Sequence, residues 1–255
     1  MTGEPTLAGP AGFYREAAPS PGLRAHFICA WANIVRPDHV GPIAVPPDGC
    51  VDILWSDGRL TVAGPDRIAA LPPLKPGTSI VGLRFLPGAA SHWLGLPMSE
   101  IVGLKVELRD FWGRRADDLR DAIGDAASLD ERLTRMQALV ARIAPEIDRP
   151  AGDVAATFAR MKRGGENALN DALAELDVSS RTLRRRCHEH LGYGPKTLGR
   201  ILRFQKFLDL ARQRPLGGLA AIAFDAGYAD QAHLSRDARE LSGLSPAAIQ
   251  RQYQN

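Results

Sequence analysis

Short apolar runs alternate with turn residues in the first half of the chain. Between residues 13 and 115 the turns are rich in Gly and Pro, and five apolar runs are expected to be strands: 26–34, 43–45, 51–55, 60–62 and 80–85. Residues 51–62 predict a β-hairpin that turns at Asp57 and Gly58. Short strands at this spacing are typical of a barrel or a sandwich.

A helical pattern follows the strands. Ser128 and Glu131 have the spacing of a capping box, and apolar residues recur at helical period as far as Ile143. Pro145 should end this helix, and residues 145–152 are expected to form a linker. The helix either packs within its own domain or forms a dimer seam, and the pattern leaves both open.

From residue 153 onward the pattern is helical, with breaks at glycines. Near the end of the chain, apolar residues at 219, 222, 223 and 226 form one face of a short helix. Gly227 can take the left-handed conformation that ends it, and Asp230 is an N-cap for the next helix. This arrangement predicts a helix-turn-helix, whose second helix enters a DNA major groove. The side chains that it would present include Gln231, His233, Ser235 and Arg236.

An earlier copy of the same pattern spans residues 168–191. Ser179 is the expected N-cap of its second helix, and Leu183 and Cys187 face inward. The opposite face carries Arg181, Arg184 and Arg185. Because Arg can contact guanine through two hydrogen bonds or clamp phosphates, we favour DNA contact over a solvated basic face.

A helix over residues 197–214 is expected to join the two copies. Its Arg200, Arg203 and Lys206 either touch backbone phosphates or face solvent. If this helix is rigid, the two second helices reach successive major grooves, which requires about 34 Å between them.

The net charge of +3 hides an asymmetry between the two parts of the chain. Residues 151–255 carry 16 Lys and Arg against 11 Asp and Glu, hence +5, and residues 1–150 carry 16 against 18, hence −2. The C-terminal part therefore has the charge that phosphate binding needs. The three cysteines are widely spaced, which indicates a reducing cytoplasm and argues against structural zinc. Residues 1–12 lack the features of a signal peptide and are expected to be a disordered tail.

Residues 166–253 closely resemble the DNA-binding domain of the AraC/XylS family of bacterial transcription regulators. The matching elements include Leu191-Gly-Tyr-Gly-Pro195, Gly227-Tyr228, His233-Leu-Ser-Arg236 and Gly243-Leu-Ser-Pro246. The chain departs from the family at core positions, with Cys187, Leu234 and Ala238 where aromatic residues are common. The pattern and the resemblance together give these expected DNA contacts: Ser180, Arg181, Thr182, Arg184, Arg185, Arg203, Gln231, Ala232, His233, Ser235 and Arg236. A contact from Ala232 would be apolar.

The N-terminal part resembles an uncharacterised sensor-like domain that is fused to such regulators. The resemblance rests on Pro47-Asp-Gly-Cys-Val-Asp-Ile-Leu54 and Gly82-Leu-Arg-Phe-Leu-Pro-Gly88. It implies a small cupin-like β-barrel that binds an effector or mediates dimerisation. Arg84 would bind an anionic ligand or face water, and Trp31 and Trp55 would line an apolar pocket or belong to the core.

The sequence thus predicts an α+β chain in which a mainly-β cupin-like barrel and a helix precede an all-α domain. The expected divisions are a tail (1–12), a sensor or dimerisation domain (13–144), a linker (145–152) and a domain with two helix-turn-helix units joined by a long helix (153–255). We expect a cytoplasmic, sequence-specific transcription regulator that binds double-stranded DNA and is controlled by a small-molecule effector. The alternatives are control by dosage or a protein partner, and an enzyme or DNA-repair module fused to the helices. RNA polymerase and a second copy of the chain are further candidate partners, whereas no cofactor, metal, catalytic residue or membrane contact is expected.

Overall fold

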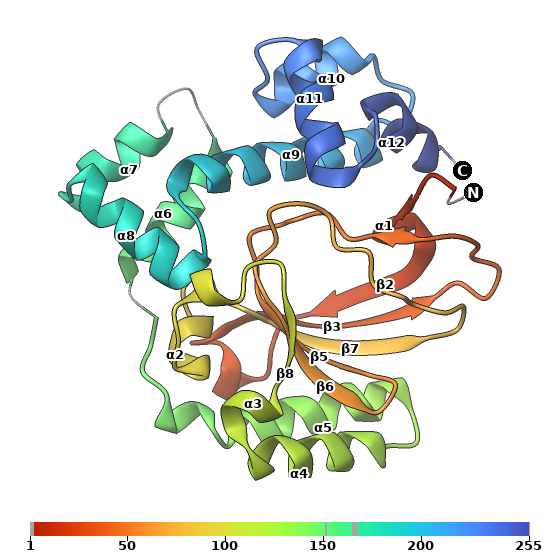
Figure 1. Cartoon of the computed structure of the whole chain (residues 1–255), viewed down its shortest axis with the longest axis vertical. Coiled ribbons are helices and arrows are strands. Elements are labelled where there is room, and N and C mark those ends of the chain that lie inside the picture. Colours follow the sequence, from red (N-terminus) through yellow and green to blue (C-terminus); the bar gives the residue numbers. More distant parts are fainter. Residues whose placement is uncertain (1–2, 151, 165–167, 255) are drawn as a thin grey trace.

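The computed structural model describes residues 3–150, 152–164 and 168–254. Figure 1 shows a sheet between two helical layers, with the C-terminal helices on one side and α4 and α5 on the other. Six strands form the sheet, all antiparallel, in the spatial order β2 (Gly12–Ala17), β3 (Phe27–Val35), β7 (Ser79–Phe85), β5 (Asp52–Ser56), β6 (Arg59–Ala63) and β8 (Lys105–Glu107).

One face of the sheet carries the larger core of the N-terminal part. Alternate strand residues such as Trp55, Val62 and Leu83 are buried there, because successive side chains point to opposite faces. The helices that cover this face are α4 (Arg114–Gly124) and α5 (Leu129–Ala141). Helix α5 therefore packs within its own domain, which is the first of the two alternatives that its pattern left open.

The local turn and cap signals are confirmed. Strands β5 and β6 form the expected hairpin, and Asp57 and Gly58 have φ angles of 50° and 74°, as a tight hairpin turn requires. The Ser128 side chain accepts a hydrogen bond from the Glu131 backbone N–H and so caps α5.

The expectation of a disordered tail is wrong for residues 3–12. Strand β1 (Thr6–Leu7) pairs in parallel with β4 (Ile43–Ala44), and α1 (Ala8–Ala11) follows directly. Leu7 is 1% exposed, because it packs among the C-terminal helices. Leu7, the buried Ala11 and the pairing with β4 order a segment whose composition gives no such signal. Residues 1 and 2 lie outside the described part.

The sheet is open where the resemblance implied a closed barrel. Strands β2 and β8 lie at its two edges and are not paired with each other. The α+β class, with a mainly-β part followed by helices, is confirmed. Small elements complete the N-terminal part: 3-10 turns η1 (Pro21–Leu23), η2 (Met98–Glu100) and η3 (Ala144–Glu146), and helices α2 (Ala90–Leu94) and α3 (Arg109–Trp112).

The regular elements in the described residues of the C-terminal part are all helices. Turn η3 and the start of α6 at Gly152 shorten the expected linker. The helices are α6 (Gly152–Arg163), α7 (Ala168–Leu176), α8 (Ser180–Leu191), α9 (Pro195–Gln213), α10 (Leu219–Ala226), α11 (Gln231–Ser242) and α12 (Pro246–Gln252). Within the described residues, every helix is too short or too polar to span a bilayer.

Candidate nucleic-acid interface

Helices α7 and α8 form the first helix-turn-helix. The Ser179 side chain accepts a hydrogen bond from the Thr182 backbone N–H at 3.2 Å, so Ser179 caps α8 as expected. Leu183 and Cys187 are fully buried and hold α8 against its neighbours. The turn itself contains Asp177 with a φ of 48°, a conformation that the sequence did not indicate.

The outer face of α8 carries basic side chains. Arg184 is exposed, and Arg185 is exposed but lies 3.4 Å from Glu189 on the next turn. The Thr182 hydroxyl lies 3.0 Å from that of Ser179, so it takes part in the cap. The predicted contacts on the solvent side of this helix are Ser180, Arg181, Arg184 and Arg185.

Helices α10 and α11 form the second helix-turn-helix. Gly227 ends α10 with a φ of 90°, and the Asp230 side chain accepts a hydrogen bond from the His233 backbone N–H at 2.6 Å. Leu234 and Ala238 are fully buried, which confirms their assignment to the core. Gln231, Ala232 and Arg236 are exposed.

Two of the predicted contacts on α11 also have partners inside the protein. The Ser235 hydroxyl donates to the Gln231 carbonyl at 2.8 Å, which leaves its lone pairs free. The His233 ring meets Tyr228 edge-on, with 5.1 Å between ring centroids, and its Nε2 lies 4.0 Å from Asp237. His233 is therefore held in one orientation at the surface of the helix.

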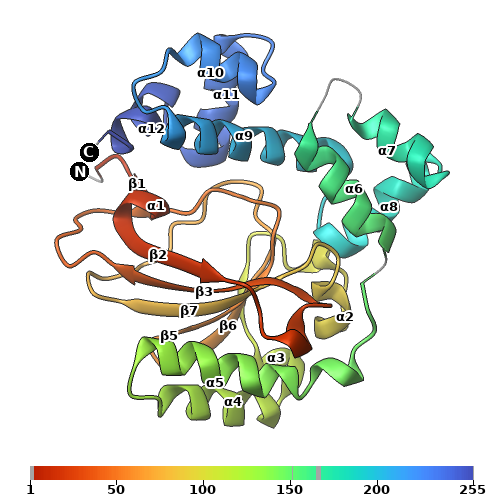
Figure 2. The same ribbon diagram turned by 180° about the vertical axis from the view of Figure 1, so that it is seen from behind.

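Helix α9 places the two units at its opposite ends, as both views in Figures 1 and 2 show. Of the three basic side chains expected to touch phosphate or face solvent from this helix, Lys206 is exposed, whereas the other two contact groups of the protein. Arg200 donates to Asp237 at 2.6 Å and also pairs with Glu240, so it ties α9 to α11 rather than facing solvent. The Arg203 guanidinium lies 5.3 Å above the Tyr228 ring.

The three residues of the expected ligand pocket do not lie together. Trp31 and Arg84 share one face of the sheet, where both meet Asp52: the Trp31 Nε1 donates to it at 3.0 Å and the Arg84 Nε at 3.2 Å. Trp55 points to the opposite face, because it lies three residues after Asp52 on β5. There its Nε1 donates to the Arg120 carbonyl, so Trp55 belongs to the core.

Arg84 is enclosed by carboxylates. Besides Asp52 it contacts Asp48 at 3.1 Å, and 24% of its side chain is exposed. Burial raises the pKa of Asp52, and the Arg84 guanidinium opposes that shift. A Cβ at Gly82 would lie 2.4 Å from the Trp31 indole, so the ring fills the space above the strand. The face around Arg84 is therefore packed with protein groups.

The cysteines are not poised for nucleophilic chemistry. Burial raises the pKa of Cys29 to about 12 and that of Cys187 to about 11, and it also raises the pKa of Cys50. A thiol with a raised pKa is protonated at neutral pH and reacts slowly. A DNA-repair module that removes methyl groups needs an activated thiolate, so these raised pKa values argue against that alternative.

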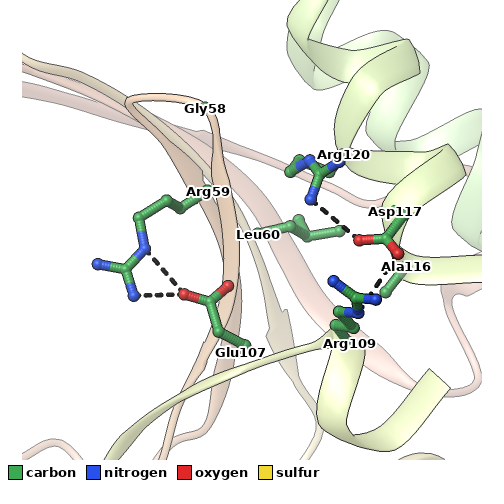
Figure 3. Close-up of a pocket in the computed structure, with 8 residues that line it drawn as sticks. All are labelled: Gly58, Arg59, Leu60, Glu107, Arg109, Ala116, Asp117 and Arg120. Atoms are coloured by element: carbon green, nitrogen blue, oxygen red, sulfur yellow. Dashed lines mark hydrogen bonds and ion pairs between the residues drawn. The ribbon is translucent and has the colours of Figure 1, made fainter. Parts of the chain in front are cut away.

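A surface cavity of about 250 Å³ was not predicted from the sequence. Figure 3 shows the residues that line it. It lies beside the β5–β6 turn, on the side of the sheet that α4 covers. Each of its arginines faces a carboxylate: Arg59 donates to Glu107 at 2.8 Å, and Arg109 and Arg120 flank Asp117. The cavity lining is completed by Gly58, Leu60 and Ala116.

A junction between the two parts of the chain was also not predicted. A Cβ at Gly49 would lie 2.9 Å from the Phe158 ring, so this loop packs directly against α6. Gln205 on α9 donates to the Pro47 carbonyl at 2.7 Å. Ser91 Oγ lies 2.7 Å from His190 Nδ1, which places α2 against the last turn of α8. The loop that holds Asp48 therefore touches the helices that carry the DNA-reading units.

Comparison with known domain families agrees with this geometry. Residues 173–252 match a family described as a helix-turn-helix domain, and this stretch contains α8 to α12. The C-terminal part of the chain is an AraC-type helix-turn-helix domain. Residues 15–107, which hold most of the sheet, match a domain of unknown function, DUF6597. Residues 113–173 match an RNA helicase DeaD dimerization domain; here they run from the helices that cover the sheet into the AraC-type domain.

A solved structure extends the likeness to 88% of the chain. The apo form of a ToxT variant from Vibrio cholerae has a TM-score of 0.52 and 12% identity, over 88% of this chain and 97% of that one. ToxT itself, also from Vibrio cholerae, has a TM-score of 0.48 and 11% identity, over 88% and 98%. The first likeness shows a shared fold, in which a sheet domain precedes the AraC-type domain. No curated protein matches the sequence.

Proposed function

We propose that the protein is a sequence-specific DNA-binding transcription regulator of the cytoplasm. The observation that carries the proposal is the pair of capped helices, α8 and α11, at opposite ends of α9. Each has a buried face and an outer face with exposed donors, Arg181 and Arg184 on one helix and Gln231 and Arg236 on the other. Helices that present such side chains can read base edges in the major groove.

The remaining predicted contacts have narrower roles in this proposal. Ser180 and Arg185 reach phosphate or base edges from α8, and Ala232 offers an apolar contact to a thymine methyl group. Arg203 is fixed by Tyr228, so it touches phosphate only where the backbone of the DNA passes α9. Thr182, His233 and Ser235 shape the reading helices and contact DNA through their free atoms.

The first test is selection of genomic fragments with the purified protein at two salt concentrations. A motif with two contact blocks about one helical turn apart is expected. Binding without a motif that vanishes as salt rises would show phosphate contact alone and would contradict sequence-specific reading.

Single substitutions then test the reading helices. Arg184→Ala and Arg236→Ala should each weaken binding to the selected site by about 1–3 kcal/mol and relax specificity. Arg115→Ala is the matched control, because Arg115 is exposed and ion-paired in the sheet domain, away from α8 and α11. Normal binding by both reading-helix variants would show that these helices do not read the site.

The proposal includes control by a small effector bound in the N-terminal part. Arg84 beside Trp31 would hold an anionic group, but the anion would first have to displace Asp48. Because the Asp48 loop touches α6 and α9, such displacement would reach the AraC-type domain. A thermal-shift screen of small acids tests this, since a ligand that binds the folded state raises the melting temperature. Loss of the shift in Arg84→Met would assign the site.

A second mode of control needs no small ligand. The indole of Trp31 and the carboxylates around Arg84 fill the face where the ligand was expected, which favours regulation by dosage or by a protein partner. A screen in which no compound stabilises the protein, while the DNA site is bound without additives, would support this mode. RNA polymerase and a second copy of the chain are the partners included in the proposal.

A further inference from the structure

The two edges of the sheet differ in their protection against pairing. Strand β8 has three residues and carries Lys105 and Glu107, and short charged edges resist association. Strand β2 has six residues, and all of them except Gly12 are exposed. Phe13 is 57% exposed on one face and Tyr14 is 46% exposed on the other. Among the described strands β2 pairs with β3 alone, so its outer backbone groups point away from the sheet.

We propose that this edge is a dimer interface, in which β2 of one copy pairs antiparallel with β2 of a second copy across a twofold axis. The proposed function includes a second copy of the chain as a partner, and this proposal says which surface that copy would bind. The dimer itself does not depend on DNA binding. A second copy fits because a twofold axis makes a strand its own antiparallel partner.

Charge selects the register of this pairing. Along the free edge of β2, the backbone N–H and C=O groups of every second residue point outward. In an antiparallel pair these residues must lie opposite the same kind of residue in the second copy, so the twofold axis passes through a residue and not between two. An axis at Arg15 would oppose two arginines, and an axis at Glu16 would oppose two glutamates, and like charges in these positions are unfavourable. An axis at Phe13 would draw in Ala11, which belongs to α1.

An axis at Tyr14 avoids these conflicts. Tyr14 then faces Tyr14 of the second copy, and each Phe13 faces an Arg15 whose charge is paired with Asp130 of its own copy, so no like charges oppose each other. The Tyr14 ring is already oriented by Trp31, 5.8 Å away between centroids, and by its hydrogen bond to Glu16. The exposed aromatic residues on both faces of β2 are thereby covered.

Disulfide trapping tests the register without DNA. Opposed residues in an antiparallel pair have Cα atoms about 4.5–5.5 Å apart, within the range that a disulfide spans. Tyr14→Cys should therefore give a covalent dimer under mild oxidation. Ala17→Cys is the matched control, because two copies of Ala17 would be six residues apart along the strands, about 20 Å.

Sedimentation of unmodified protein tests the dimer itself. Wild type and Val40→Lys, which places a charge on a loop residue that is 89% exposed, should both dimerise. Tyr14→Lys should be monomeric, because two like charges would face each other on the axis. A monomeric wild type across micromolar concentrations, or equal trapping of the Tyr14→Cys and Ala17→Cys variants, would overturn the proposal. Neither result would affect DNA binding by a single copy. Failure of the dimer proposal can therefore be told apart from failure of the proposed function.

Discussion

In the sheet domain, Arg84 provides the positive charge that compensates two partly buried carboxylates. It faces Asp48 and Asp52, and Asp52 is also bonded to Trp31. Strand alternation puts Arg84 on the face opposite Leu83 and Phe85, which are both in the core. Its partners could not be foreseen, because Asp48 lies in a turn whose Asp-Gly pair is already explained by turn chemistry.

Replacement of Arg84 by Met should destabilise the protein by about 3 kcal/mol. This is the low end for breaking a buried ion pair, since a quarter of the side chain is exposed. Arg59→Met is the control, because the Arg59–Glu107 pair is largely exposed and should contribute less than about 1 kcal/mol. Urea unfolding of both variants measures the difference, and equal losses would show that burial of the Arg84 cluster has no energetic consequence.

The same variant should respond to pH in a defined direction. Burial raises the pKa of Asp52 in the folded state, and removal of Arg84 takes away the group that opposes the rise. The folded protein then binds a proton at a pH where the unfolded chain has released it, so stability increases as pH falls. Between pH 7 and 5, Arg84→Met should regain more stability than wild type does. A constant gap in unfolding free energy over this range would contradict the assignment.

At the scale of elements, helix caps connect stability to DNA reading. Ser179 caps α8 and Ser245 caps α12, and each side chain accepts a backbone hydrogen bond at 3.2 Å. Ser179→Ala and Ser245→Ala should each cost about 1 kcal/mol of folding free energy. Only Ser179→Ala should also weaken binding to a selected DNA site, because α8 is a reading helix and α12 is not. Matched losses of DNA binding in the two variants would indicate a general stability effect.

Elements defined by local chemistry could be predicted from the sequence. The β5–β6 hairpin, the caps at Ser128, Ser179 and Asp230, and the end of α10 at Gly227 each depend on two or three neighbouring residues. Elements that depend on distant partners could not.

Strand β1 illustrates this limit, because it is two residues long and exists through its pairing with β4. The opposite faces of Trp31 and Trp55 likewise follow from the register of the sheet, which no local pattern fixes. The open edge at β2 has the same origin, since it depends on which strands pair. The DNA contacts could be predicted on two helices, because the helical period of the apolar residues separates the buried face from the exposed one. A ligand pocket is built from residues of several strands and leaves no such period in the sequence.

At the scale of the molecule, the junction between the sheet domain and α8 contains two stacked histidine rings. His190 lies parallel to His92, with 5.6 Å between ring centroids, and is bonded to Ser91. Burial lowers the pKa of His190 in this docked state, and His92 and the nearby arginines Arg186 and Arg185 act in the same direction, while Glu189 opposes them. The docked state therefore disfavours the protonated ring.

Acid should loosen this junction. As pH falls through the ordinary His pKa of about 6.5, a freed His190 takes a proton more readily than a docked one, so docking loses stability. Small-angle scattering should show a larger radius of gyration at pH 5 than at pH 7.5, and His190→Asn should reduce the change. His39→Asn, in a loop away from the junction, is the control. A radius that does not depend on pH would show that protonation does not separate the two parts.

The hydrogen bonds between Gln252 and the N-terminal segment determine when that segment can reach its final position during synthesis. Its side chain accepts from the Leu7 backbone N–H at 2.8 Å and donates to the Pro5 carbonyl at 2.9 Å. Leu7 and Pro5 thus wait for a residue 245 and 247 positions later in the chain before these contacts can form. The sheet can assemble as its strands emerge, because domains generally fold as units from the N-terminus. The buried position of Leu7 is completed only once α12 has been synthesised, so a chain that stops before α12 would leave that apolar residue open to chaperones and proteases.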